Sequence, residues 1–223
     1  ALRARGFVFP RRYSRVGLWY GLPAPARLPP HEPHPTSRRS HLPVPGVATT
    51  EVQEVNVAGC TPDEFRSAMR QLAAAVSIVA AGRPGQRNGL TATAVMSLTA
   101  EPPRLVVAVN KDASAYHLLV GEAGFCVNVL AHSQLPVGMR FSGLIKGEER
   151  FQQGDWETLA TGAPALRGAL ANFDCRLARV VDCGTHALLI GDVMVARCCA
   201  GEEPLVYVDG QWASLPRPQM PRA

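Results

Sequence analysis

The sequence predicts a mainly β domain with peripheral helices, arranged as a small barrel of about six antiparallel strands. One observation is a series of short runs between residues 76 and 215 that alternate apolar and polar residues or are apolar throughout, as strands do. Another is the turn-rich sequence between them: Asn88-Gly89 and Asp209-Gly210 are typical of tight hairpins. Small barrels pair each strand with its neighbours, so we expect a closed sheet without exposed edges.

The net charge of +5 belongs to the start of the chain rather than to this domain. Residues 1–50 hold eight arginines and one acidic residue, Glu32, whereas residues 51–223 hold fifteen basic and seventeen acidic residues. The basic balance therefore indicates no nucleic-acid-binding face on the domain. Residues 1–57 also carry nine prolines and no persistent period. We expect a disordered Pro/Arg-rich extension over residues 1–57, one domain over residues 58–216 and a frayed tail over residues 217–223.

Six cysteines are present, and none stands in a C-x-x-C pair, so neither zinc ligation nor dithiol redox chemistry is indicated. Cys126 and Cys175 fall within predicted strands, where a thiol usually packs as a small apolar group. No apolar run reaches 18 residues, so no transmembrane helix is expected. Together these features predict a cytoplasmic protein with free thiols.

A helix is predicted to begin at Thr61. Thr61 and Glu64 have the spacing of a capping box, and Pro62 suits the first helical position. Phe65 and Met69 belong to an apolar face with a spacing of three and four residues. We expect a structural helix that packs over one end of the barrel.

Residues 89–103 are predicted to form one long strand that ends at two consecutive prolines. Alternate positions place small and apolar residues on one face and the hydroxyls of Thr91, Thr93 and Ser97 on the other. A row of hydroxyls among small residues suits a polar, phosphate-bearing ligand. The alternative is a half-solvated strand whose outer face is polar.

The next run, Arg104 to Asn110, is almost entirely apolar and predicts a strand buried on both faces. Ser114 follows and is expected to cap a short helix that continues to Leu119. Lys111 and Ser114 thus lie where a loop meets a helix, which suits an anion. The alternative is a solvated lysine and an ordinary helix cap.

A further strand is predicted from Gly124 to Leu130, and it contains one polar residue, Asn128. Burying an amide without partners costs about 1–3 kcal/mol, so Asn128 must bond either to the backbone or to a ligand. A helix is expected from Ser133 to about Phe141, and then a charged loop over residues 143–155. The remaining predicted strands cover residues 169–181, 186–197, 205–208 and 211–215.

Several catalytic motifs are absent from the sequence. It has no G-x-S-x-G elbow, no G-x-x-x-x-G-K-[ST] phosphate loop and no G-x-G-x-x-G fingerprint after a strand. A Ser hydrolase and a Rossmann-type dehydrogenase are therefore not indicated. A nicotinamide cofactor would have to bind as a transient substrate.

Seven segments resemble the flavin reductase-like family, and most closely the reductase components of two-component flavin monooxygenases, of the 4-hydroxyphenylacetate hydroxylase and pyrimidine-utilisation type. The segments stand in the family's order over about 150 residues, from Phe65 to Leu215. They are FRSAMRQLAAAVSIV, GLTATAVMSLTAEPPRLVVAVN, FCVNVL, MRFSG followed by ERF, FDCRL, GTHALLIGDV and PLVYVDG.

The resemblance implies an FMN-binding split β-barrel that works as an NAD(P)H:flavin oxidoreductase. It implies FMN or FAD as the flavin, NADH or NADPH as the co-substrate, a homodimer, and a partner monooxygenase that receives the reduced flavin, with no nucleic acid or membrane as partner. His186 is implied as the catalytic residue, on the nicotinamide side. The flavin-binding residues that it implies are Thr91, Ala92, Thr93, Ala94, Ser97, Asn110, Lys111, Ser114, Asn128, Leu130, Lys146, Arg150 and Phe151.

Two other functions remain open on the sequence. The first is a flavin-binding protein of the same fold without reductase activity, which would act in sensing or storage. The second is an enzyme similar to pyridoxine-phosphate oxidase, whose barrel is related. The preference between FMN and FAD and the preference between NADH and NADPH also stay open.

Overall fold

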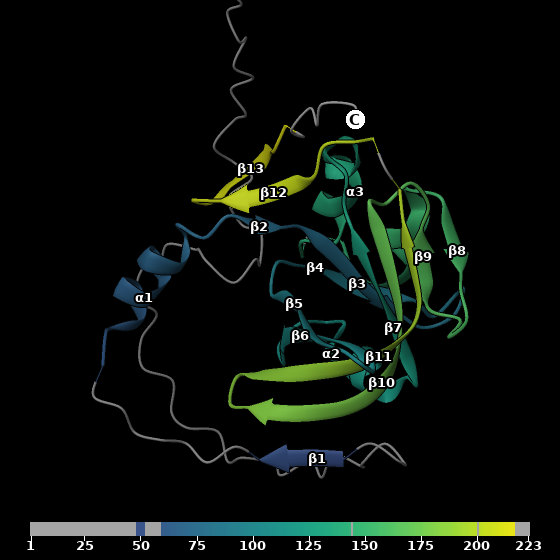
Figure 1. Ribbon diagram of the computed structural model, residues 1–223, viewed down its shortest axis with the longest axis horizontal. Helices are drawn as coiled ribbons and strands as arrows, with labels where there is room; N and C mark the ends of the chain where they lie inside the picture. Colours follow the sequence, from purple (N-terminus) through teal and green to yellow (C-terminus); the bar gives the residue numbers. More distant parts are fainter. Residues whose placement is uncertain (1–47, 52–58, 144, 200, 217–223) are drawn as a thin grey trace, which may run out of the picture.

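A mostly antiparallel sheet forms the body of the domain in the computed structural model, which describes residues 48–51, 59–143, 145–199 and 201–216 (Figure 1). Its strands follow the order β4-β3-β7-β10-β11-β6-β5, and β1 pairs with β10. They are β1 (Ala48–Glu51), β3 (Ser77–Ala81), β4 (Asn88–Ala92), β5 (Val95–Ala100), β6 (Pro103–Asn110), β7 (Gly124–Val129), β10 (Ala171–Cys183) and β11 (His186–Cys198). The predicted mainly β fold with peripheral helices is confirmed.

Smaller elements surround this sheet. A three-stranded sheet has the order β13-β12-β2, and β8 pairs with β9. The elements are β2 (Ala74–Ala75), β8 (Trp156–Thr158), β9 (Pro164–Leu166), β12 (Leu205–Val208), β13 (Gln211–Ser214), α1 (Pro62–Met69), α2 (Tyr116–Gly121), α3 (Leu135–Arg140) and the 3-10 segments η2 (His132–Gln134) and η3 (Gly147–Gln152).

The long strand predicted over residues 89–103 is wrong, because the chain breaks into β4 and β5 at Thr93 and Ala94. β4 pairs with β3, whereas β5 pairs with β6, so the chain changes its sheet neighbour at the break. The amide of Val95 donates to the carbonyl of Thr93 over 3.0 Å, and the amide of Ala108 donates to the carbonyl of Ala94 over 3.0 Å. The strand path is therefore open between its two end strands, which differs from the expected closed sheet.

The two larger apolar cores of the described residues lie on opposite faces of the sheet. Alternation along β3 shows this division, since Val79 belongs to one core and Ile78 to the other. The first core contains Leu119 of α2 and the second contains Phe141 at the end of α3. β6 contributes the fully buried Val107 to the first core, in agreement with the buried strand expected there.

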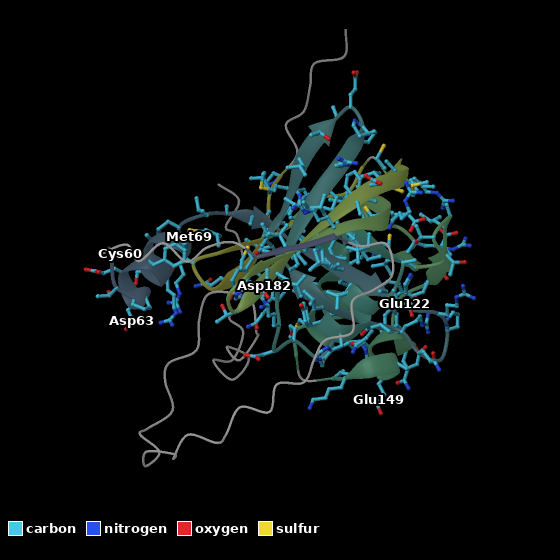
Figure 2. All side chains as sticks on the ribbon, turned by 90° about the horizontal axis from the view of Figure 1, so that it is seen from below. Cys60, Asp63, Met69, Glu122, Glu149 and Asp182 are labelled. Carbon is cyan, nitrogen blue, oxygen red and sulfur yellow. The ribbon has the colours of Figure 1, made fainter. Side chains whose placement is uncertain are left out.

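The capping box at Thr61 is confirmed, since Thr61 and Glu64 bond reciprocally at the start of α1. The expected packing of α1 over the barrel is wrong, because no residue of α1 is buried. Phe65 is 44% exposed, and α1 lies at one margin of the domain (Figure 1). Figure 2 shows Asp63 of α1 set apart from the body of the domain. Periodicity shows that a helix has an apolar face and does not show what covers it.

Two further expectations concern the ends of elements. Ser114 does not cap α2, whose N-cap is Ala115 and has no side-chain cap bond. β1 falls within the extension that was expected to be disordered, and it pairs in parallel with residues 179–182 of β10. Residues 1–47, 52–58 and 217–223 lie outside the described residues. They include most of the expected N-terminal extension and the whole of the expected frayed tail. No helix in the described part of the chain is long and apolar enough to cross a membrane.

Asn128 connects four strands at the centre of the domain and is fully buried. Its Nδ2 donates to the carbonyls of Ile78 over 3.1 Å and of Pro164 over 3.2 Å. Its Oδ1 accepts from the amide of Leu166 and from the Nδ2 of Asn172, each over 2.8 Å. The sequence left open whether the backbone or a ligand satisfies the side-chain amide of Asn128. In the structure, groups of the protein satisfy it.

We expect Asn128→Ala to lower the free energy of unfolding by about 2–4 kcal/mol, because it leaves several buried polar groups without partners. Gln71→Ala, at an exposed position, serves as the control and is expected to change stability by less than about 0.5 kcal/mol. Urea unfolding of both variants measures the difference. Equal stabilities would show that the amide network contributes nothing.

Candidate functional site

A cavity of about 370 Å³ opens where β4 and β5 separate, within the size range of ligand pockets. The break between these strands, the end of β6, the loop before α2, the end of α3 and the segment before η3 form its walls. The lining residues are Leu90, Thr91, Ala92, Thr93, Ala94, Ala108, Asn110, Asp112, Ala113, Ser114, Phe141, Ser142, Gly143, Lys146 and Arg150.

The strand break supplies polar backbone to this cavity. Thr93 and Ala94 belong to no strand, and within the described residues their amides form no backbone hydrogen bond. The polar groups of Thr91, two residues earlier, already bond to the protein. Its Oγ1 donates to the carbonyl of Gly138 over 2.7 Å, and its amide donates to the carbonyl of Phe141 over 3.2 Å. Thr91 thus fixes the end of α3 against β4, and the two open amides remain for a ligand.

Arg150 is the principal charge of the cavity, and its side chain is almost fully buried at 3% exposure. Its guanidinium donates to the Oδ1 of Asn88 over 2.9 Å, to the carbonyl of Gly89, to the carbonyl of Ile145 over 2.6 Å and to the Oγ of Ser114 over 3.4 Å. None of the salt bridges formed by the described residues involves Arg150. Burial lowers the pKa of Arg150, yet an arginine stays protonated, so the cavity holds a cation that pairs with no carboxylate of the described residues.

Other polar groups extend this positive region. Lys146 is exposed and stands at the N-cap of η3, and Ser142 and Ser114 add hydroxyls to the lining. Asp112 opposes them as the single acidic residue in the lining. Two cations and one carboxylate favour an anionic ligand, and hydroxyls and open amides are suitable donors to phosphate oxygens.

An ion pair between Arg87 and Glu148 fixes η3, the segment that carries Arg150. Arg87 donates from its backbone amide and its Nε to the carboxylate of Glu148, each over 2.8 Å. Hydrogen bonds from Arg87 lower the pKa of Glu148, so this carboxylate is ionised at neutral pH. The guanidinium of Arg87 also lies 4.5 Å from the ring centre of Phe151, which stabilises η3 against the loop before β4.

Eight of the predicted flavin-binding residues meet in the cavity: Thr91, Ala92, Thr93, Ala94, Asn110, Ser114, Lys146 and Arg150. Five others lie outside it, for reasons of packing. Ser97 is on the exposed strand β5, and Lys111 pairs with Asp182. Asn128, Leu130 and Phe151 are buried in the protein interior, where Asn128 is bonded to protein groups and the other two belong to an apolar core.

His186 begins β11 and lies beside the cavity without lining it, opposite Asn110 of β6. Its Nδ1 is 2.8 Å from the Oγ1 of Thr185. Burial lowers the pKa of His186, Asp112 raises it and Lys111 lowers it, so the net direction is down. The imidazole is therefore neutral at pH 7 and can donate or accept one hydrogen bond.

Seven lining residues were not predicted: Leu90, Ala108, Asp112, Ala113, Phe141, Ser142 and Gly143. A signal existed for Phe141, Ser142 and Gly143, because they belong to the MRFSG segment that carries part of the family resemblance. Leu90, Ala108 and Ala113 are small or apolar, and no residue type marks them as ligand contacts. Their place in the cavity depends on how β4, β6 and the loop before α2 come together.

The chain is similar to known proteins over most of the described domain. Residues 69–216 match the family described as "Flavin reductase like domain". The FMN reductase (NADH) RutF of Ancylobacter novellus is 44% identical over 153 residues, which cover 69% of this chain and 84% of that protein. Among solved structures, BorF, the flavin reductase component of a bacterial two-component tryptophan halogenase, has 32% identity and a TM-score of 0.64, and the match covers 69% of this chain and 98% of that one.

A third relative extends the comparison to a monooxygenase system. The nitrilotriacetate monooxygenase component B homologue of Mycobacterium thermoresistibile has 25% identity and a TM-score of 0.65. The match covers 72% of this chain and 89% of that one.

We expect inorganic phosphate to stabilise the protein through Arg150. At a phosphate concentration ten times the Kd, linkage predicts about 1.4 kcal/mol, or about 3–5 °C in Tm. Arg150→Met should abolish this shift, because it removes the buried cation. Arg83→Met, at an exposed position of the loop before β4, should keep it.

Thermal scans at constant ionic strength, with chloride replacing phosphate in the reference samples, measure these shifts. The same phosphate-dependent rise in Arg150→Met as in the unchanged protein would show that Arg150 is not the anion site.

Proposed function

The chain belongs to the flavin reductase-like family, and on that premise we propose that it uses NADH to reduce FMN and delivers the reduced flavin to a partner monooxygenase. The enzyme class is an oxidoreductase of the flavin reductase type. The choice of FMN and NADH follows the printed activity of the Ancylobacter relative, with FAD and NADPH as the alternatives. The partner follows the two-component systems of the structural neighbours.

The observation that carries this proposal is the buried Arg150, which has no carboxylate partner in the described part of the chain and lies at the wall of a 370 Å³ cavity. A buried unpaired cation is unfavourable unless an anion completes the site. FMN supplies both a phosphate for such a cation and a planar ring with several hydrogen-bonding heteroatoms. No other group in the cavity lining indicates a reaction that requires a nucleophile or a strong general base.

The residues present fit a flavin. Arg150, Lys146 and Ser114 would hold the phosphate, and the amides of Thr93 and Ala94 would meet heteroatoms of the ring. Bound flavin supplies the acceptor for a hydride, which is the chemistry that the protein itself lacks. The protein binds and orients the two partners and excludes water from between them.

His186 is proposed to act on the nicotinamide-bearing substrate. It lies opposite Asn110 at the rim of the cavity, where a second molecule can approach a flavin that is already bound. A neutral imidazole adds a hydrogen bond without adding charge. The sequence lacks a dinucleotide fingerprint, which supports a nicotinamide cofactor that enters and leaves with each turnover.

A flavin-binding protein without reductase activity is the competing function. Anaerobic addition of NADH to the protein with FMN separates the two, because a reductase bleaches the flavin absorbance within seconds and a storage protein does not. The same assay with FAD and with NADPH ranks the alternatives. A flavin that stays oxidised with both nucleotides would overturn the reductase assignment.

We expect Thr93→Val to raise the Kd for FMN about fivefold, since it removes a neutral hydroxyl from the lining, worth about 1 kcal/mol. His186→Ala should leave that Kd nearly unchanged and lower kcat/KM for NADH. Flavin titration followed by steady-state turnover measures both. If His186→Ala weakens FMN as much as Thr93→Val does, His186 belongs to the flavin side.

A homodimer in the cytoplasm is part of the proposal. Met96 and Leu98 lie on β5, which ends the strand path, and they are 61% and 44% exposed. Apolar side chains on an end strand are typical of a surface that a second copy covers.

We expect a dimer in sedimentation at micromolar concentration, and Met96→Glu should shift it towards monomer because it places a charge in the contact. Gln211→Glu on β13 is the control at an exposed position. A monomer for the unchanged protein would contradict the dimer. A dimer unaffected by Met96→Glu would place the contact elsewhere.

A further inference from the structure

Lys111 stands between residues of the flavin cavity but does not line it. Asn110, Asp112, Ala113 and Ser114 line the cavity on either side of it in the sequence. Asn110 closes this turn, because its Oδ1 accepts from the amide of Asp112 over 2.8 Å and its carbonyl accepts from the amide of Ala113 over 3.1 Å. The turn therefore presents its other residues to the cavity and leaves the Lys111 side chain for a contact elsewhere.

That contact is with the turn between β10 and β11. The Nζ of Lys111 donates to the Oδ2 of Asp182, and the amide of Lys111 donates to the carbonyl of Thr185 over 3.0 Å. The Oδ1 of Asp182 accepts from the amide of Gly184 over 3.0 Å, which closes the turn. Lys111 thus binds both ends of the turn, one through its side chain and the other through its backbone.

His186 follows this turn directly. It lies opposite Asn110 in the pairing of β11 with β6, and its Nδ1 is 2.8 Å from the Oγ1 of Thr185. The residue whose carbonyl binds Lys111 is therefore also the residue whose hydroxyl contacts the imidazole. A continuous path of contacts leads from the cavity-lining turn through Thr185 to the ring of His186.

The ion pair contributes to local geometry more than to stability. The side chains of Lys111 and Asp182 are 28% and 43% exposed, and ion pairs at such exposure add little to the free energy of unfolding. Burial raises the pKa of Tyr116, and the charges of Lys111 and Asp182 shift this pKa in opposite directions. The pair therefore lies near the half-buried Tyr116 at the start of α2, where it fixes the turn against the domain.

We propose that Lys111 and Asp182 are positioning residues, which clamp the β10–β11 turn to the flavin-lining turn and so set the place of the His186 imidazole at the rim of the cavity. In this role they act through His186 and not on the flavin. The action of His186 on the hydride donor rests on the proposed function, whereas the clamp rests on contacts within the protein.

The first test measures the clamp in the protein without flavin, by hydrogen exchange of the Lys111 amide. Asp182→Asn keeps an oxygen that can close the turn and removes the charge that pairs with Lys111. It should speed this exchange about fivefold or more, because the bond from Lys111 to Thr185 opens more often. Arg176→Met is the matched control, since Arg176 lies on the same strand and pairs with Asp192, and it should change the exchange less than about twofold.

The second test follows turnover with FMN and NADH. Lys111→Met keeps the aliphatic stem and removes the ammonium. It should lower kcat/KM for NADH about fivefold or more, because a displaced imidazole is misplaced in the reacting complex, and it should change the Kd for FMN less than about twofold. In the His186→Ala background the same substitution should cause no further loss, since the residue through which it acts is gone. Lys111→Arg, which keeps the charge, should recover most of the loss.

Unchanged exchange of the Lys111 amide in Asp182→Asn would overturn the clamp. A loss of kcat/KM in Lys111→Met that is equally large in the His186→Ala background, or a matching rise in the Kd for FMN, would show that Lys111 acts elsewhere and would overturn the positioning role. If Lys111→Met fails to fold, Asp182→Asn takes its place in the second test.

These outcomes are distinguishable from a failure of the proposed function, because amide exchange requires neither flavin nor NADH. A protein that does not bleach FMN with NADH, but exchanges the Lys111 amide faster in Asp182→Asn, would keep the clamp and lose the reductase. A protein that bleaches FMN, but shows the same exchange in Asp182→Asn as in Arg176→Met, would keep the reductase and lose the clamp.

Discussion

The burial of the Arg150 guanidinium is the constraint on which the site depends. Removing a cation from water is unfavourable, and here no described carboxylate offsets it. The guanidinium instead takes backbone carbonyls and polar side chains from three parts of the chain: the start of β4, the loop before α2 and the segment before η3. These segments form three walls of the cavity, so the bonds that satisfy Arg150 also fix the shape of the space in front of it.

The break in the strand at Thr93 and Ala94 fixes the uncharged part of the site. A continuous strand would pair its amides with one neighbouring strand. Here the chain pairs with β3 before the break and with β6 after it, so the amides of Thr93 and Ala94 have no backbone partner among the described residues. This change of neighbouring strand thus explains both why the strand path is open and why free backbone amides lie at the cavity.

The two cavities that meet at Thr93 and Ala94 differ in charge, although an arginine lines each of them. Arg150 lies with Lys146 against Asp112 and favours an anion, whereas Arg70 lies with Asp209 in a smaller and more aromatic space.

The sequence by itself determined the local features: the capping box of Thr61, the runs that become β3, β6 and β7, and the requirement that Asn128 be satisfied once buried. Eight of the residues that the family resemblance implies as flavin-binding line the cavity. Only the tertiary structure decided that Asn128 is satisfied by Ile78, Pro164, Leu166 and Asn172, that Lys111 turns to Asp182, and that residues 89–103 divide between two neighbours. The physical reason is range: periodicity and capping act within a few residues, whereas Arg150 reaches Gly89 across 61 positions of the chain. A pattern can show that a side chain needs a partner, and only the folded chain shows which one it has.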